Sequence, residues 1–322
     1  MAAAPSSPAH SALLADLRAR AETAAHRTGA ACPCGATRTL ADRPDATVVR
    51  HGDTVAKAHA PGTSHADLAA RLAVAAALPG VLLPPLATTP LPVGDRLVTF
   101  WPHGAPVDPD DPDAAPWESA ATLLARLHLA QPPPGTGPLP VMRGPRKAAR
   151  AVAALAARSR HPAVPHVLRA WAALPAWARG EAPQPGRATL CHGDLHLGQL
   201  VRHPAPGGAW LLIDVDDLGT GAPAWDLARP AAWYACGLLP PGEWARFLAA
   251  YRAAGGPAVA ADGDPWPALD VPARALTAQT AARALAKAAG ENRAPNEVEL
   301  SVLDACARMA AAPPEPTGAH RA

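Results

Sequence analysis

Two polar segments that flank a hairpin signal constrain the fold of this chain more than any other feature. The first, CHGDLHLGQL, occupies residues 191–200, and the second, LLIDVDD, places Asp214 twenty residues after Asp194. Between them, HPAPGGAW supplies Pro206 and Gly207 as a turn signal between the strand-like pieces GQLVR and AWLLIDV. We therefore predict a β-hairpin that folds the two polar segments back on each other.

The hairpin register predicts which side chains meet. A turn centred on Pro206 and Gly207 pairs residues whose numbers sum to 413, so Gln199 and Asp214 should face each other with Cβ atoms about 5 Å apart. Mg²⁺ suits such a pair, because it favours carboxylate and carbonyl oxygens and takes further ligands from water and phosphates. Asp194, in the loop before the hairpin, is expected to accept a proton at the edge of the same site.

Strand-like and helical patterns occupy different parts of the chain. Before residue 104 we predict these elements: helix 11–26, strands 36–41, 46–50 and 54–60, helix 63–78 and strand 94–101. Gly52-Asp53 predicts a type II′ hairpin turn. After a connector at 106–116 come predicted helices at 117–131, 146–160, 165–179, 242–256, 270–290 and 297–312.

This order of elements predicts an α+β fold with two lobes. We expect a nucleotide-binding lobe with a leading helix at residues 1–103 and a helical catalytic and substrate-binding lobe at 104–311. Residues 312–322 should form a disordered tail.

Composition excludes several classes of protein. The net charge is +2 and the 29 basic residues form no stripe, which argues against a nucleic-acid partner. No charge-free run reaches the ~18 residues of a membrane span, and the N-terminus is a poor secretion signal, so we expect a cytoplasmic protein with no membrane partner. Five cysteines argue against a disulfide framework. The CPCG motif at 32–35 lacks a second cysteine pair, so we interpret it as a turn rather than a zinc site, although His26 is close.

HGDLHLGQ, LIDVDD and PAWDLAR together resemble the catalytic core of the aminoglycoside phosphotransferase and choline kinase superfamily, relatives of the protein kinases. The resemblance extends over roughly residues 37–311 and is most specific across 191–229. It implies a two-lobed protein-kinase-like fold with ATP and Mg²⁺ in the cleft between the lobes. The implied enzyme is a small-molecule kinase that phosphorylates a hydroxyl group.

The resemblance also implies a role for each central residue. Asp194 becomes the catalytic base and Asp214 the principal magnesium ligand. Gln199 takes the place of the usual asparagine as the second metal ligand, with one more methylene. Lys57, in TVAKAH, matches the strand lysine that holds the nucleotide phosphates.

The nucleotide lobe departs from the kinase pattern. Its first turn, ADRPDAT, contains no glycine, so backbone amides or Thr47 are expected to hold the nucleotide, and ATP versus GTP stays open. Trp101 either lines the adenine pocket or packs in the core. Asp67 either pairs with Lys57 or completes a capping box with Ser64, and the two roles are compatible.

The remaining polar and aromatic residues of the motifs are expected to brace the loop or to contact the substrate. His192 and Asp226 are expected to brace the catalytic loop. Four residues are candidate substrate contacts: His196, Asp216, Asp217 and Trp225. Asp216 and Asp217 are predicted on a strand with alternating directions, His196 also suits a structural role, and Trp225 suits core packing as well as stacking on a sugar.

The acceptor class is less constrained than the reaction. The HGDLHLGQ variant is similar to actinobacterial maltokinases, which favours a sugar, an amino sugar or a related metabolite. An antibiotic-resistance phosphotransferase is the alternative, although a mildly basic chain gives no sign of the acidic pocket that polycations need, and a choline-like acceptor comes third. Two other classes are a metallohydrolase, from the H-x-D-x-H spacing, and a kinase-like binding protein without activity.

Overall fold

The computed structural model describes residues 8–26 and 34–311, which form parts of two compact units. The sheet unit comprises residues up to Pro116 together with Gln131–Pro140 and Leu197–Asp216. The helical unit comprises Trp117–Ala130, Val141–His196 and the chain from Asp217 onward. Each unit is therefore discontinuous in sequence. The lobes at 1–103 and 104–311 stay a prediction, and the predicted tail lies outside the described residues.

A five-stranded antiparallel sheet forms the base of the sheet unit, with strand order β1-β2-β3-β5-β4. Its strands are β1 (Arg38–Arg43), β2 (Ala46–His51), β3 (Thr54–Ala58), β4 (Leu91–Val93) and β5 (Arg96–Pro102). At the β2–β3 turn, His51 pairs with Thr54, and φ is positive at Gly52 but not at Asp53. This is the type II′ pattern, so the predicted two-residue turn is confirmed.

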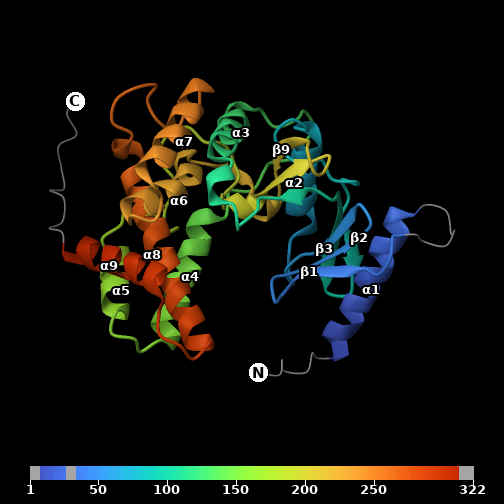
Figure 1. Ribbon diagram of the computed structural model, residues 1–322, viewed down its shortest axis with the longest axis horizontal. Helices are drawn as coiled ribbons and strands as arrows, with labels where there is room; N and C mark the ends of the chain where they lie inside the picture. The colour runs from blue at the N-terminus through green and yellow to red at the C-terminus, as the bar shows by residue number, and fades with distance from the viewer. Residues whose placement is uncertain (1–7, 27–33, 312–322) are drawn as a thin grey trace. The chain divides into compact units, whose positions relative to one another are not determined.

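Helix α1 (Pro8–Ala25) lies along this sheet (Figure 1). Its Leu17 and Ala21 are completely buried in one apolar cluster with residues of the strands: Val49, Ala56, Ala58, Val93 and Val98. Burying one leucine side chain contributes about 1.5–3 kcal/mol. Apolar packing therefore holds α1 to the sheet.

Helix α2 (His65–Ala77) follows β3 and begins with the predicted cap. The Ser64 hydroxyl accepts a hydrogen bond from the backbone N–H of Asp67 at 3.2 Å. Such a cap satisfies one of the amides that the first helical turn leaves without an intrahelical partner. Leu68 and Leu72 are completely buried, so α2 is anchored by both its cap and its apolar face.

The predicted hairpin belongs to a second sheet of the same unit, with strand order β6-β8-β9. Its strands are β6 (Ala105–Pro106), β8 (Leu200–His203) and β9 (Ala209–Leu212). Leu200 pairs with Leu212 and His203 with Ala209, so paired numbers sum to 412. The predicted sum of 413 is wrong, because it assumed a two-residue turn, whereas the loop at 204–208 has an odd number of residues.

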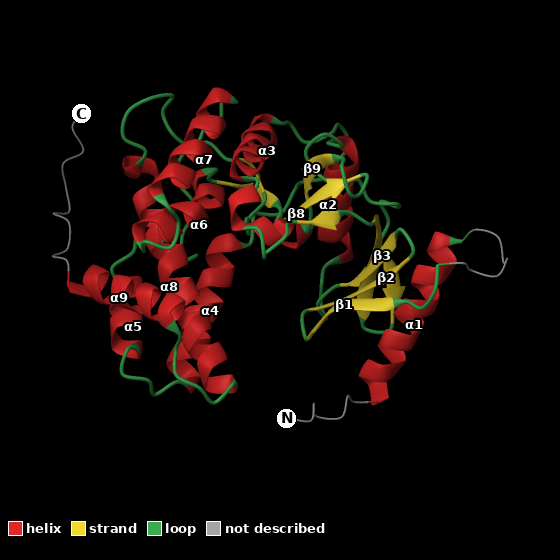
Figure 2. Ribbon diagram, in the orientation of Figure 1, coloured by secondary structure: helices red, strands yellow, loops and turns green. Residues whose placement is uncertain are grey.

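The helical unit packs around its longest helix. Its described helices are α3 (Trp117–Leu129), α4 (Gly144–Arg158), α5 (Val164–Ala172), α6 (Ala224–Ala235), α7 (Pro241–Ala253), α8 (Trp266–Gly290) and α9 (Glu297–Ala311). Helix α8 contacts α4, α5, α6 and α9 (Figure 2). The core between these helices consists of small and branched apolar residues, among them Val152, Val167, Ala281 and Leu303.

Prolines account for the main differences from the predicted helices. The helix predicted at 165–179 ends at Ala172, because Pro175 cannot continue it. Helix α6 is not predicted from the sequence, since Pro230 lies within it and disrupts the helical pattern. The connector, predicted to lack regular structure, contains the end of β6 and the short 3-10 helix η1 (Pro112–Ala114).

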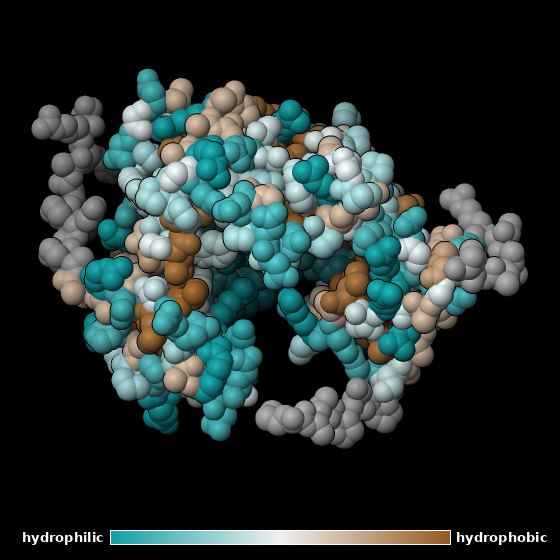
Figure 3. Space-filling model, viewed as in Figure 1, coloured by the Kyte–Doolittle hydropathy of each residue, from teal (hydrophilic) through white to brown (hydrophobic). Residues whose placement is uncertain are grey.

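The face shown in Figure 3 is mostly hydrophilic. On the face shown in Figure 3, hydrophobic residues form separate patches among hydrophilic ones. Among the described residues, no helix combines the length and the apolar character needed to cross a membrane.

Candidate active site

The HGD loop follows the short strand β7 (Thr189–Cys191), which pairs with β10 (Gly219–Gly221) in the helical unit. Gly193 has a φ of +85°, and a Cβ at this position would lie 2.5 Å from the carbonyl oxygen of Asp217. Only glycine combines this backbone conformation with so close an approach. The loop that carries Asp194 is thereby held against the segment that carries Asp217.

Asp226 of α6 braces the back of this loop. Its carboxylate accepts the backbone N–H of His192 at 2.6 Å and that of Gly193 at 2.7 Å. The Nε2 of His128 lies 3.0 Å from the same carboxylate, and its Nδ1 lies 2.7 Å from the hydroxyl of Tyr251. Because these groups are buried, their hydrogen bonds fix the loop conformation. The brace involves the backbone of His192 and the side chain of Asp226, the two residues expected to serve it.

Four charged side chains around the loop form what we call the Lys147 cluster: Lys147 of α4, Asp194, Asp217 and Arg229 of α6. The Nζ of Lys147 lies 2.5 Å from Oδ2 of Asp194 and 2.5 Å from Oδ2 of Asp217. The Nη2 of Arg229 lies 2.5 Å from the other oxygen of Asp194, Oδ1. Both oxygens of Asp194 therefore face a cation.

These cations determine the protonation state of the cluster. Burial alone would raise the pKa of Asp194, but the charges of Lys147 and Arg229 outweigh it and hold that pKa well below its ordinary value, with a smaller effect from the partly buried His196. Burial alone would lower the pKa of Lys147, but Asp217 and Asp194 outweigh it and raise that pKa. At neutral pH Asp194 is a carboxylate and Lys147 an ammonium group.

A second group, the Lys57 cluster, lies in the sheet unit and contains Lys57, His59, Gln199, Asp214 and Asp216. The Nζ of Lys57, on β3, lies 2.7 Å from Oδ1 of Asp214 and 3.0 Å from Oδ2 of Asp216. Burial alone would lower the pKa of Lys57, but the two carboxylates outweigh it and raise that pKa. One ammonium group faces two carboxylates here, which leaves negative charge for a divalent cation to offset.

His59 ties Asp216 to the five-stranded sheet. Its Nδ1 lies 2.7 Å from Oδ1 of Asp216, and its Nε2 lies 2.8 Å from the hydroxyl of Thr99. That hydroxyl also accepts the indole N–H of Trp101 at 2.8 Å. Burial alone would raise the pKa of Asp216, but Lys57 and His59 outweigh it and keep that pKa well below its ordinary value. Trp101 is buried in this network, and its contact with adenine stays a prediction.

The contact between Asp214 and Gln199 does not arise from the strand register that was predicted from the sequence. A one-residue register difference would send a strand side chain to the opposite face. Asp214, however, lies just beyond β9 with a left-handed φ of 65°, and we attribute the direction of its side chain to this conformation. The Nε2 of Gln199 donates to Oδ2 of Asp214 at 3.4 Å, while the backbone oxygen of Gln199 accepts the N–H of Ile213.

The donor set of this pair suits magnesium. Asp214 offers carboxylate oxygens, which Mg²⁺ prefers over nitrogen or sulfur donors. Rotating the Gln199 amide by half a turn would place its carbonyl oxygen, which accepts rather than donates, where its nitrogen now lies. Both residues can therefore hold Mg²⁺.

Two residues expected to bind the nucleotide make structural contacts. The amide of Asp67 caps α2 through Ser64, and among the described residues the salt bridges of Lys57 go to the aspartates of its own cluster and not to Asp67. Thr47 is buried, and its hydroxyl donates to Asp42 at 3.3 Å beside the glycine-free β1–β2 turn. Nucleotide contacts of Asp67 and Thr47 stay predictions.

Three of the four expected substrate residues are engaged within the protein, and the fourth, His196, is half-buried two residues after Asp194. Asp216 and Asp217 lie in a short 3-10 turn, so the strand predicted for them is wrong, and each is ion-paired with a different lysine. Trp225 is buried, and a Cβ on Gly144 would lie 2.1 Å from its indole nitrogen. Of the two roles left open for Trp225, this contact supports packing against the start of α4.

A family match covers both clusters. The phosphotransferase enzyme family matches residues 38–271, more than half of the chain. The chain belongs to this family. No curated protein matches it closely enough to count as a relative.

Solved structures share the phosphotransferase fold at low sequence identity. A choline/ethanolamine kinase family protein from Mesorhizobium loti is 19% identical with a TM-score of 0.57, over 93% of this chain and 94% of that one. A macrolide 2'-phosphotransferase, MphH from Brachybacterium faecium, is 20% identical with a TM-score of 0.51, over 94% and 100%. A spectinomycin phosphotransferase, in complex with ADP and spectinomycin, is 13% identical with a TM-score of 0.55, over 87% and 93%.

These matches confirm three predictions from the sequence. They confirm the resemblance to the aminoglycoside phosphotransferase and choline kinase superfamily, the α+β protein-kinase-like fold, and an enzyme that is a phosphotransferase. The family match extends over much of the span in which the sequence resemblance was seen.

Three residues in the clusters of this phosphotransferase are not predicted from the sequence: His59, Lys147 and Arg229. Lysine is rare in the chain, so a lysine in a helix rich in arginine and alanine was a usable signal for Lys147. The K-x-H spacing, which places two side chains on one face of a strand, was a usable signal for His59. Arg229 ends the PAWDLAR motif and donates to the backbone oxygen of Leu195 at 2.9 Å, a tertiary contact that the sequence does not encode locally.

Proposed function

We propose that this phosphotransferase transfers the γ-phosphate of ATP to a hydroxyl of a small molecule, with a sugar, an amino sugar or a related metabolite as acceptor. The observation that carries the proposal is Asp194, a carboxylate held by two cations on a braced loop. Use of ATP is supported by the related spectinomycin phosphotransferase, whose structure contains ADP.

The Lys57 cluster is suited to binding the nucleotide phosphates. Lys57 is a buried ammonium group whose partners, Asp214 and Asp216, are the kind of carboxylates that a divalent cation can take over. Asp214 and Gln199 would hold Mg²⁺, which when bound offsets charge on the phosphates. Lys57 would then turn to the phosphates, and His59 would keep Asp216 in place.

Asp194 would orient the acceptor hydroxyl and accept its proton. The low pKa of Asp194 makes it a weak base, and this is compatible with phosphoryl transfer because the transition state is largely dissociative and demands positioning more than early deprotonation. Each carboxylate oxygen retains a lone pair beyond its contact with a cation, so the hydroxyl can still be bound.

Lys147 and Arg229 would have different tasks in this scheme. Arg229 anchors the loop, because it contacts both Asp194 and the backbone of Leu195. Lys147 bridges Asp194 and Asp217 with a compact ammonium group. We propose that Lys147 also neutralises charge on the transferring phosphoryl group.

The charge balance of the clusters favours an acceptor that is not a polycation. A polycationic antibiotic requires uncompensated carboxylates in its pocket. In the Lys147 cluster, the two carboxylates of Asp194 and Asp217 face the two cations of Lys147 and Arg229 instead, and the negative charge left in the Lys57 cluster would be offset by Mg²⁺. This supports a sugar-like acceptor over an aminoglycoside.

The test is a screen for acceptor-dependent ATP consumption. The full-length protein with ATP and Mg²⁺ is given mono- and disaccharides, amino sugars, aminoglycosides and amino alcohols, and the phosphorylated product is identified by mass spectrometry. We expect ADP formation with a sugar-like acceptor, its loss in Asp194→Asn and its retention in Asp270→Asn. Asp270 is a carboxylate on α8 that forms a surface salt bridge with Arg274.

Two outcomes would contradict the proposal. Zinc- or manganese-dependent hydrolysis without ATP would indicate a metallohydrolase. Binding of ATP and Mg²⁺ without turnover on any acceptor would indicate a kinase-like binding protein.

A further inference from the structure

A group of metal-ligating side chains lies away from both clusters, where α1 ends beside the five-stranded sheet. His26 follows α1, Cys34 precedes β1, and His51 is the last residue of β2. One donor atom from each of these three residues lies within 4.8 Å of the donor atoms of the other two. The residues come from three separate segments, so the fold and not sequence proximity brings them together.

The distances match the edges of a tetrahedral zinc site. Zinc binds imidazole nitrogen at about 2.0–2.1 Å and thiolate sulfur at about 2.3 Å, which puts two nitrogens about 3.3 Å apart and a nitrogen and a sulfur about 3.6 Å apart. In the structure, Nε2 of His26 lies 3.3 Å from Nε2 of His51 and 3.4 Å from Sγ of Cys34. One proton on the His26 nitrogen cannot point at both neighbours, whereas one cation between the three can accept all three lone pairs.

The orientation of His51 is also that of a metal ligand. Its ring is buried, and its Nδ1 lies 2.9 Å from the hydroxyl of Thr37. Histidines that bind metals usually engage their second nitrogen in such a hydrogen bond, which fixes the tautomer and directs the other nitrogen at the ion. The rings of His26 and His51 are nearly perpendicular, at 88°, so they approach the shared point from different directions.

A second group with ligand-like geometry serves as a comparison. His128, Cys191 and Asp226 are all buried in the helical unit. Both ring nitrogens of His128 have protein partners, and Asp226 accepts backbone amides of the HGD loop. That group is accounted for by the loop brace. The group around His51 lies in the sheet unit and takes no part in that brace.

We propose that His26, Cys34 and His51 bind one zinc ion that fastens the end of α1 to the β2–β3 hairpin. Two imidazoles and a thiolate form a borderline-soft donor set that favours zinc over Mg²⁺ or Ca²⁺. Cys34 is exposed, which gives the ion a path from solvent. The fourth position is taken by water or by a further donor of the chain.

Zinc at this site would attach the end of α1 to the sheet by metal–ligand bonds, in addition to the apolar packing that holds this helix. The zinc would connect α1 directly to His51, six residues before Lys57 in the chain. A zinc site here replaces the interpretation of CPCG as a plain turn. That interpretation rested on the missing second cysteine pair, whereas the additional ligand is a histidine seventeen residues after Cys34. Cys32 of that motif lies outside the described residues, and the proposal does not use it.

The test measures metal bound to the full-length protein. Protein loaded with zinc and passed through gel filtration should retain one zinc ion per chain by elemental analysis. Replacement by Co²⁺ should give the visible bands of a tetrahedral ion and a thiolate-to-cobalt charge-transfer band. Both signals should be lost in Cys34→Ser and His51→Ala, and kept in the controls Cys236→Ser and His65→Ala.

Two results would overturn the proposal. The first is wild-type protein that retains no zinc and shows no charge-transfer band with cobalt, a result that does not depend on whether any variant folds. The second is a cobalt spectrum that is the same in wild type and in Cys34→Ser. Neither result affects the proposed phosphotransfer, which is measured separately by ADP formation.

Discussion

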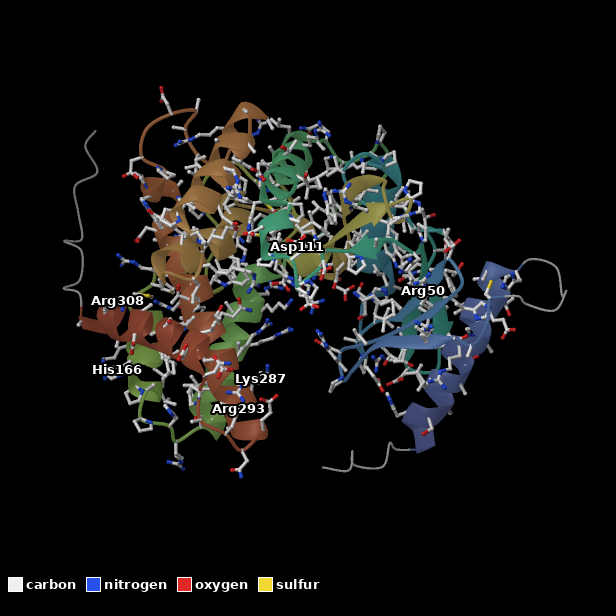
Figure 4. All side chains as sticks on the ribbon, in the orientation of Figure 1. Arg50, Asp111, His166, Lys287, Arg293 and Arg308 are labelled. Atoms are coloured by element: carbon white, nitrogen blue, oxygen red, sulfur yellow. The ribbon has the colours of Figure 1, made fainter. Side chains whose placement is uncertain are left out.

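Lysine occurs at only three positions in this chain, and two of them lie at the centres of the charged clusters. Lys57 and Lys147 each contact two aspartates, whereas Lys287 is exposed near the end of α8 (Figure 4). Arginine supplies almost all other positive charge. A compact ammonium group fits between two carboxylates where a planar guanidinium would not. We therefore expect that arginine cannot substitute for either lysine.

The first prediction concerns Lys147 and the pH dependence of activity. In Lys147→Met, Asp194 keeps only Arg229 as a close cation, so its pKa should rise toward its ordinary value. A carboxylate with a higher pKa is protonated at higher pH. The acid limb of the kcat/KM profile should therefore move to higher pH, and kcat on the plateau should be lower than in the wild type. The measurement is a pH series of acceptor-dependent ADP formation.

Lys287→Met provides the matched control for this experiment. It removes the remaining lysine from an exposed position, so its pH profile should be that of the wild type. An acid limb that is the same in Lys147→Met and in wild type would contradict the role assigned to Lys147.

The sequence predicted which residues belong to the two clusters better than it predicted their partners. Asp194, Asp214, Gln199 and Lys57 stand in motifs whose order predicts a phosphotransferase. The cations around Asp194 come from α4 and α6, at residues 147 and 229, and such long-range pairing leaves no local pattern. The pairing of Lys57 with hairpin aspartates is likewise a consequence of the fold.

Among the elements, the β8–β9 hairpin shows how loop length sets the position of a side chain. Its five-residue loop shifts the register by one, and the left-handed conformation of Asp214 compensates. The sequence predicted two strands joined at Pro206-Gly207, because alternating apolar residues and proline are local signals, but the two-residue turn predicted there is wrong. The register depends on the number of loop residues, which the Pro206-Gly207 signal did not define.

The second prediction concerns the left-handed backbone of Asp214. Asparagine tolerates this conformation as aspartate does, whereas for a β-branched residue it costs about 1–2 kcal/mol. Asp214→Asn and Asp214→Val should both lose activity, since both remove the carboxylate. Only Asp214→Val should lower the free energy of unfolding further, by roughly that amount.

Urea unfolding of the two variants side by side measures this difference. Loss of the salt bridge to Lys57 is common to both and cancels in the comparison. Equal stabilities would mean that the positive φ at residue 214 is not maintained.

For the whole molecule, the buried ion pairs predict how stability depends on pH. Asp194 and Asp216 have pKa values below their ordinary value of 3.8, so the native state binds fewer protons than the unfolded state in acid. Their contribution to stability is present above about pH 4 and is lost as pH falls below it. Lys57 has a raised pKa, so its contribution is complete below its ordinary value of 10.5 and is lost only at higher pH.

The measurement is the free energy of urea unfolding between neutral and acid pH. We expect a decrease below about pH 4 in the wild type and a shallower decrease in Lys147→Met, where Asp194 is less perturbed. The same acid slope in both proteins would show that the ion pair between Lys147 and Asp194 contributes nothing to stability.

Asp194 and Asp214 have separate roles in the proposed reaction, the first toward the acceptor hydroxyl and the second toward the metal and nucleotide. Nucleotide binding in the presence of Mg²⁺, by calorimetry, and acceptor-dependent turnover should be measured on the same preparations of Asp194→Asn and Asp214→Asn. We predict that Asp194→Asn binds nucleotide like the wild type while turnover falls by ~10²–10⁴-fold, and that Asp214→Asn loses magnesium-dependent binding as well as turnover. Equal loss of binding and turnover in both variants would contradict the account.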